Sequence, residues 1–214
     1  MRTWTGGWST LQREDLAVVA KGALGRHDEG LRIGTGMATA FCNAIEGLFE
    51  SKTGLTVLSL ARVVCDLFSA DARWSTGYIV FTVLLRQGGV WKVFNCGTNI
   101  VFSWSVEGME MVVRPQSVAE EVRSRGESEP PSYIEVIVVK AATCECKAED
   151  IREATVDSSR IVAFGDYRVA DAVQREVHDT MMSRAELDEL VCRVAETLIN
   201  PQKAYVMLTG EGKE

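Results

Sequence analysis

Residues 77–114 read GYIVFTVLLRQGGVWKVFNCGTNIVFSWSVEGMEMVVR, and this stretch is the strongest indication of the fold. It is rich in β-branched and aromatic residues, and glycines at 88, 89, 97 and 108 divide it into short runs. Such runs are typical of strands joined by tight turns, so the stretch predicts an antiparallel meander. Its first run is apolar on both faces, which indicates a layer on each side of that strand.

Two helices are expected before the meander. In residues 34–50 and again in residues 56–68, apolar side chains recur every three or four positions, which is the period of a helix with one buried stripe.

Helices and strands alternate after the meander. Residues 117–124 are expected to be helical, 126–132 form a polar loop, and 133–143 and 161–166 are expected to be strands. A helix or turn is expected around 169–177. Ser183, with Glu186 three residues on, predicts a capping box that begins a further helix, and residues 203–209 are expected to close the chain as a strand.

Helices paired with helices and strands with strands predict an α+β sandwich. The length of 214 residues, 46% hydrophobic and 25% charged, favours one domain over residues 1–214 with a sizeable core.

Composition also argues against several classes of function. The net charge of −7, with no block of lysines or arginines, is unfavourable for binding nucleic acid. The longest apolar stretch, near residues 77–85, is far short of the roughly 20 residues that a membrane helix needs. Six cysteines without a secretory leader favour a cytoplasmic protein, and Cys144 and Cys146 lack the spacing of a zinc site, which favours a strand edge.

The segment VVAKGALGRH, residues 18–27, places Lys21 at the end of an apolar run. A lysine at the end of a strand is usually solvated, and no cofactor motif supports a catalytic lysine. His27 and His178 are expected to be solvated as well.

The order of these segments resembles the metal-dependent protein phosphatases of type 2C, the PPM family, from about Asp15 to the C-terminus. VVAKGALGRH and the helix after it resemble the family's strand, Asp-Gly and glycine-rich loop with histidine. Residues 75–104 resemble the strand pair with the Gly-Asp-Ser-Arg turn, and residues 114–126 the stretch after it. SSRIVAFGDYRVADAV (158–173) and INPQKAYVMLT (199–209) resemble the last two motif strands. The resemblance implies an αββα sandwich, in which two antiparallel sheets are flanked by helix pairs.

Family members use a pair of Mg²⁺ or Mn²⁺ ions to hydrolyse phosphoserine or phosphothreonine, and such ions need several oxygen ligands. By the resemblance, Glu14, Asp15, Gly22 and Asp166 are the remnant metal-site positions. The spacing from Glu14 and Asp15 to the next motif is shorter than in the family, which predicts a trimmed hairpin. Without partner acids, Asp166 would instead serve only to cap the helix after it.

Other metal-site positions are substituted. Lys21 stands in place of the bridging aspartate, Gln202 in place of the terminal aspartate, and Lys203 in place of asparagine. Thr98 and Ile100 replace the acid and the arginine of the Gly-Asp-Ser-Arg turn. Thr10 aligns with the phosphate-binding arginine, for which Arg13 would substitute only after a backbone shift. A lysine ammonium repels both cations, so no metal cofactor is expected, and Lys21 could itself fill the cation site by pairing with Asp166 or Asp15.

The leading interpretation is a catalytically inactive, phosphatase-like protein that works as a scaffold or regulatory subunit for protein partners, including phosphoserine or phosphothreonine proteins. The alternative is a divergent active Mg²⁺- or Mn²⁺-dependent phosphatase that uses Glu14, Asp15 and Asp166. A third interpretation is an N-terminal-nucleophile hydrolase in which processing exposes Thr3 or Thr5 and Lys21 is the activator.

Overall fold

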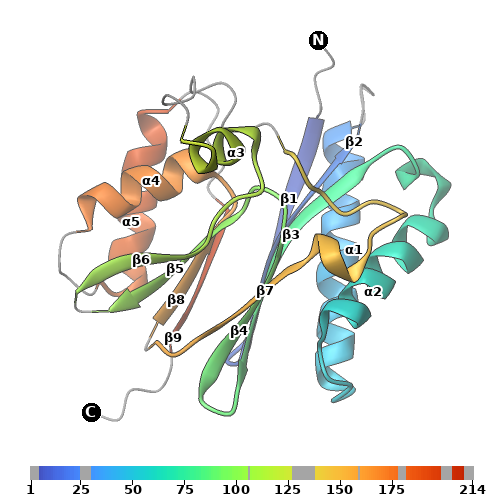
Figure 1. Cartoon of the computed structure of the whole chain (residues 1–214), viewed down its shortest axis with the longest axis horizontal. Coiled ribbons are helices and arrows are strands. Elements are labelled where there is room, and N and C mark those ends of the chain that lie inside the picture. The colour runs from blue at the N-terminus through green and yellow to red at the C-terminus, as the bar shows by residue number, and fades with distance from the viewer. Residues whose placement is uncertain are drawn as a thin grey trace.

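Two antiparallel sheets lie face to face, and helices cover their outer faces (Figure 1). The structure is a computed structural model that describes residues 5–24, 30–105, 107–126, 138–158, 160–177, 182–198 and 204–209. The first sheet has the strand order β1-β2-β3-β4-β7 and the second β6-β5-β8-β9. The expected αββα sandwich, an α+β fold, is therefore confirmed.

The strands of the first sheet are β1 (Thr5–Gln12), β2 (Leu16–Leu24), β3 (Tyr78–Gln87), β4 (Val90–Cys96) and β7 (Arg152–Val156). Those of the second sheet are β5 (Ile100–Ser105), β6 (Gly108–Val113), β8 (Arg160–Phe164) and β9 (Tyr205–Thr209).

Helices lie on opposite sides of the pair of sheets (Figure 1). The first sheet carries α1 (Gly30–Glu50) and α2 (Val57–Ala70), and the second carries α4 (Tyr167–Glu176) and α5 (Arg184–Glu196). The short helix α3 (Val118–Ser124) and the 3₁₀ turns Ala72–Trp74 and Ala148–Asp150 lie in the connections. The expected helices are confirmed, including the capping box of Ser183 and Glu186 at the start of α5.

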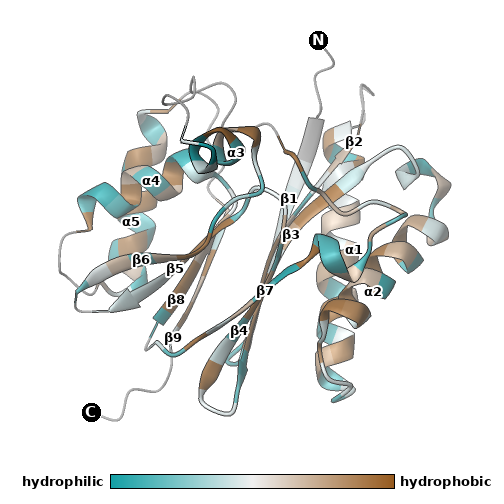
Figure 2. Ribbon diagram, viewed as in Figure 1, coloured by the Kyte–Doolittle hydropathy of each residue, from teal (hydrophilic) through white to brown (hydrophobic). Residues whose placement is uncertain are grey.

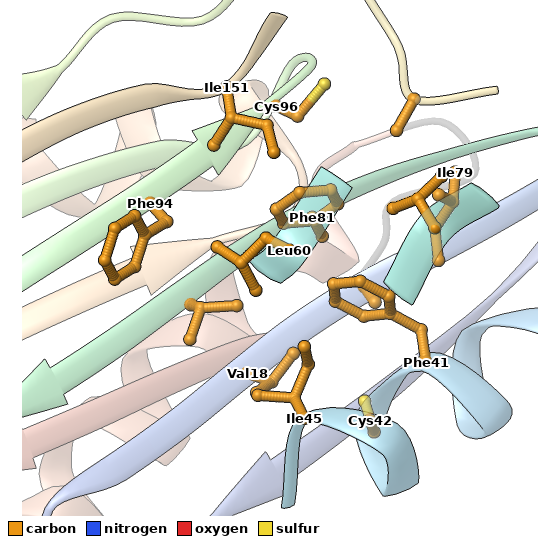
Figure 3. Packing of buried hydrophobic residues seen from close by; sticks show 14 of the residues in the cluster. Val18, Phe41, Cys42, Ile45, Leu60, Ile79, Phe81, Phe94, Cys96 and Ile151 are labelled. Atoms are coloured by element: carbon orange, nitrogen blue, oxygen red, sulfur yellow. The ribbon is translucent and has the colours of Figure 1, made fainter. Parts of the chain in front are cut away.

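Three apolar clusters hold the layers together, and hydrophobic segments lie on both the strands and the helices of the ribbon (Figure 2). One cluster lies between α1, α2 and the first sheet, where the rings of Phe41 and Phe81 are 4.6 Å apart (Figure 3). A second lies between the second sheet and the pair α4 and α5. The third, which we call the inter-sheet core, joins the facing sides of both sheets.

The meander expected over residues 77–114 is wrong in one respect. Its four strands are β3 to β6, but β3 and β4 belong to the first sheet while β5 and β6 belong to the second. The chain changes sheets at Gly97, whose φ of +103° is a conformation that favours glycine. Any larger residue would also clash there, because its Cβ would lie only 2.3 Å from Val80 Cγ1. Burial on both faces of β3, expected from its apolar run, is confirmed.

Two strands were not expected from the sequence. β1 is rich in glycine, serine and threonine, and β7 is largely exposed, so neither has a strong apolar pattern. Most of the strand expected at 133–143 lies outside the described residues, and its end forms isolated bridges from Val138 to Ser117 and from Ala142 to Ile79. No helix among the described residues is long and apolar enough to cross a membrane.

Candidate functional site

Lys21 lies on the inner face of β2, toward the end of the inter-sheet core. Alternate side chains of a strand point to opposite faces, and in β2 the residues Ala17 and Val19 belong to the inter-sheet core while Val18 and Ala20 pack against the helices. Lys21 continues the inner series and is partly buried. Its ammonium group is therefore directed between the two sheets.

Trp8 of β1 is the neighbour of Lys21 across the hairpin. The two residues are paired in the strand register, and the ammonium nitrogen lies 5.4 Å from the centre of the indole ring. This distance allows a cation–π attraction. The indole also touches Gly165 at the end of β8, where an added Cβ would lie 2.2 Å from Trp8 Cζ3. Trp8 thus fills the space that a side chain at position 165 would need.

Asp166 lies directly after Gly165 and begins α4. Its side chain, in a residue only 6% exposed, accepts a hydrogen bond of 3.0 Å from the backbone nitrogen of Arg168. The Arg168 guanidinium adds hydrogen bonds of 3.1 Å from Nε and 2.7 Å from Nη2. The expectation that Asp166 caps the following helix is confirmed.

Burial and charge act on these groups together. Burial lowers the pKa of Lys21 below its usual value; the Asp166 carboxylate partly offsets this, and the Arg168 guanidinium adds to the lowering. Hydrogen bonding to Asp166 in turn raises the pKa of Arg168. We call Trp8, Lys21, Gly165, Asp166 and Arg168 the Lys21 cluster: two cations, one carboxylate and an aromatic face.

Glu14 and Asp15 are not part of the Lys21 cluster. They lie in the turn between β1 and β2, before β2 begins, so about 20 Å of strand separates Asp15 from Lys21. The residues that face Lys21 and Gly22 across the hairpin are Trp8 and Gly7. The structure therefore brings Asp166 to Lys21 but not the acidic pair, and the pairing of Lys21 with Asp15 is wrong.

Gly22 serves a packing role in the structure. A Cβ added to it would lie 2.3 Å from the carbonyl oxygen of Gly34 in α1, and a Cβ on Gly34 would lie 2.3 Å from the carbonyl oxygen of Gly22. The Gly22 carbonyl thus lies against the helix.

The remaining sequence candidates are scattered. Thr10 lies on β1 two residues from Trp8, and Arg13 forms an ion pair with Glu46 of α1. Thr98 follows the crossing at Gly97, and Ile100 is buried at the start of β5. Gln202 and Lys203 lie outside the described residues, as do His27, His178 and Thr3, and the side chain of Thr5 is not described.

The fit of a metal ion at the Lys21 cluster is poor. Divalent magnesium and manganese need several oxygen ligands, whereas two of the three charged side chains in the cluster are cations. Within the described ranges, no group of three or more histidine, cysteine, aspartate or glutamate side chains could hold a metal ion. Cys144 is exposed in a turn and Cys146 is buried just after it, so the strand edge expected at these two cysteines is wrong.

Trp8 and Arg168 are contributors that sequence reasoning missed. Arg168 carries a local signal, because an arginine two residues after a capping aspartate can fold back on it. Trp8 carries a signal only once β1 is recognised as the partner of β2, because the register then places it beside Lys21.

No protein-family model matches the sequence, and a search of curated proteins finds no match. Solved structures do match in fold. The serine/threonine phosphatase PstP/Ppp of Mycobacterium tuberculosis is 13% identical, with a TM-score of 0.62 over 90% of this chain and 93% of that one. Stp1 of Staphylococcus aureus is 12% identical, with a TM-score of 0.67 over 99% and 96%, and a bacterial serine phosphatase is 10% identical, with a TM-score of 0.71 over 98% and 92%.

Each of these matches covers at least 90% of both chains, so the similarity includes both sheets and the helices that cover them. At this identity they establish the architecture alone. The chain has the fold of the PPM-type serine/threonine phosphatases.

Proposed function

We propose that this chain uses a phosphatase fold to bind a protein partner, as a scaffold or regulatory subunit, and does not hydrolyse phosphate esters. One observation carries the proposal: Lys21 stands where the family's bridging aspartate is expected and is directed between the sheets beside Trp8 and Asp166. An ammonium group at that position repels cations, and at an effective dielectric of about 20 one like-charge contact at ~4 Å costs about 4 kcal/mol.

The Lys21 cluster also explains how the fold can hold without metal. The Asp166 carboxylate is buried, and a buried carboxylate needs a compensating cation. Arg168 and Lys21 supply positive charge from within the chain, and Trp8 occupies space next to Gly165. A protein-binding role would then use the outer surface, while the Lys21 cluster serves as structure.

The test is a calorimetric titration of Mn²⁺ into chelator-treated protein at neutral pH. We expect no saturable heat up to millimolar Mn²⁺ for the natural sequence. Asp166→Asn serves as a matched variant, because it removes the cluster's carboxylate while keeping an oxygen that can cap α4. Saturable binding at micromolar concentration, lost in Asp166→Asn, would contradict the proposal.

A divergent, active phosphatase is the second candidate, because the solved structures with this fold are phosphatases and one of them, the catalytic domain of PstP, was solved in complex with two manganese ions. This candidate requires turnover of a phosphoserine or phosphothreonine peptide that depends on Mn²⁺ or Mg²⁺. If Asp166 is a metal ligand, Asp166→Ala abolishes that turnover. Turnover that survives the substitution contradicts the role of Asp166, and the absence of turnover contradicts the candidate.

A further inference from the structure

A polar hollow lies at the opposite end of β2 from Lys21. It has a volume of about 540 Å³ and is lined by the turn between β1 and β2, by β8, by the start of α5 and by β9. Gln12 Nε2 donates a hydrogen bond of 2.7 Å to the Met207 carbonyl, which ties β1 to β9 across the two sheets at this end. The hollow therefore has walls from both sheets.

The charge of this hollow opposes that of the whole chain. Three arginines, Arg13, Arg160 and Arg184, line it together with a single acid, Glu14. This is a surplus of two positive charges in a chain whose formal net charge is −7. The arginines come from three separate elements, so they converge on the hollow through the fold and not through a run of sequence.

The three arginines differ in how firmly they are held. Arg13 is already paired with Glu46, and Arg160 donates to the Met182 carbonyl and lies 5.7 Å from the centre of the Trp104 ring. A guanidinium has five N–H donors, so Arg160 is oriented by these contacts and keeps donors for a ligand. Arg184 is exposed at the first turn of α5.

We propose that this hollow, which we call the arginine pocket, binds a phosphate group, either as the free ion or as a phosphomonoester on a larger molecule. A phosphate anion complements the positive surplus, which is one charge when Glu46, the partner of Arg13, is counted, and guanidinium groups suit tetrahedral oxyanions because they donate two parallel hydrogen bonds. The volume of about 540 Å³ leaves room for the group that carries the phosphate. The site does not depend on whether Lys21 excludes metal, because it lies at the other end of the sheets.

The test is a calorimetric titration of inorganic phosphate into the full chain, with ionic strength held at about 0.1 M by sodium chloride. We expect saturable binding that is about fivefold weaker in Arg184→Gln and about fivefold tighter in Glu14→Gln, because these substitutions remove an attractive and a repulsive charge. Arg193→Gln is the matched control: it lies near the other end of α5, pairs with Glu176, and should leave the affinity within about twofold.

A capped phosphoserine peptide, titrated in parallel, distinguishes the two sources of the phosphate. Binding of the peptide at least about tenfold tighter than the free ion identifies a phosphoprotein, and equal affinities identify free phosphate. The proposal is overturned if no saturable phosphate binding occurs at constant ionic strength, or if Arg184→Gln and Glu14→Gln both bind as the natural sequence does. Circular dichroism of each variant confirms that the fold is retained.

Discussion

Lys21 combines a cost of burial with two sources of compensation. Burial disfavours the charged ammonium, while the indole face of Trp8 and the Asp166 carboxylate attract it. Removing one partner from such a group leaves an uncompensated charge, which usually costs more than replacing the pair by apolar groups. Substitutions at position 21 therefore separate the effect of charge from that of packing.

Lys21→Asp is expected to destabilise the metal-free protein by about 2–4 kcal/mol, because it places a second carboxylate beside the buried Asp166. Lys21→Met, which keeps most of the length and removes the charge, should stay within about 1 kcal/mol, since Arg168 still pairs with Asp166. Urea unfolding in the presence of a chelator measures both. Equal losses in the two variants would assign the effect to packing and not to charge.

The lowered pKa of Lys21 predicts how stability changes with pH. The folded protein releases this proton at a lower pH than the unfolded chain, whose usual value is 10.5. Between the two pKa values the unfolded chain binds more protons, so this group's contribution to stability rises with pH, and its cost is fully present below the folded pKa. Relative to Lys21→Met, the natural sequence should gain stability as pH rises toward 10.5, the usual pKa of the unfolded lysine.

Buried thiols change the stability with pH in the opposite direction. Because the natural sequence and Lys21→Met contain the same thiols, the difference in stability between them removes this effect. Burial raises the pKa of Cys42 to about 11 and that of Cys146 to about 12, so the folded protein keeps protons that unfolded thiols lose above 9.0, and stability falls as pH rises. Urea unfolding at several pH values measures the difference. Parallel stability curves for the natural sequence and Lys21→Met would show that Lys21 does not titrate differently in the folded state.

The sequence could identify only part of the Lys21 cluster. Lys21 and Asp166 stand out because each comes at the end of an apolar run, where Lys21 interrupts a family motif and Asp166 matches the acid of one. The family resemblance groups Glu14 and Asp15 with them, because a motif alone does not say where the strand turns. The register of β1 against β2 decides where the turn lies. In this register Glu14 and Asp15 lie in the turn, at the opposite end of β2 from Lys21.

At the scale of elements, helix α1 approaches the hairpin of β1 and β2 through glycines. Gly7 lies against Thr35, and Gly22 and Gly34 lie against each other's carbonyl oxygens, at separations that leave no room for a Cβ. Two other glycines of α1, Gly36 and Gly47, have nothing within 4 Å of the Cβ position. Helix α1 thus offers one constrained position, Gly34, and two unconstrained positions, Gly36 and Gly47.

Gly22→Ala and Gly34→Ala are each expected to destabilise the protein by about 2–3 kcal/mol, because the added methyl group must push α1 from the sheet. Gly36→Ala and Gly47→Ala are the matched controls and should stabilise it by about 0.5–1 kcal/mol through helix propensity. Thermal and urea unfolding measure all four. A neutral result for Gly34→Ala would mean that the helix and hairpin can separate at no cost.

Helices were easier to predict than strands for a physical reason. α1, α2 and α5 bury one stripe, and Ser183 and Glu186 mark the start of α5, so their period and caps are local signals. The sheet to which a strand belongs is not a local property. In the sequence, the crossing at Gly97 resembles an ordinary turn. Only the three-dimensional contacts show that the chain changes sheets there: Gly97 packs against Val80, and the Gln116 side chain accepts a hydrogen bond of 2.6 Å from Gly97 N.

At the scale of the whole molecule, the inter-sheet core joins two helix-covered sheets that each have a core of their own. Its buried members come from both sheets, for example Val19 and Leu84 from the first and Val101 and Val206 from the second. Asn99, at the start of β5, reaches across and donates a hydrogen bond of 3.3 Å to the Val19 carbonyl. Neither sheet can keep its inner face buried if the other unfolds, and the loss of apolar burial makes separate unfolding unfavourable.

The two sheets are therefore expected to unfold in one cooperative transition. Trp91 of β4 and Trp104 of β5 are fully buried and report on different sheets, so variants that keep one of them and replace the other four tryptophans with phenylalanine give one probe for each sheet. Urea midpoints from the Trp91 probe and the Trp104 probe should agree, within each variant, with the midpoint from circular dichroism. A Trp104 transition that precedes the dichroism transition would show that the second sheet opens by itself, and that the inter-sheet core contributes less to stability than the two helix-covered cores.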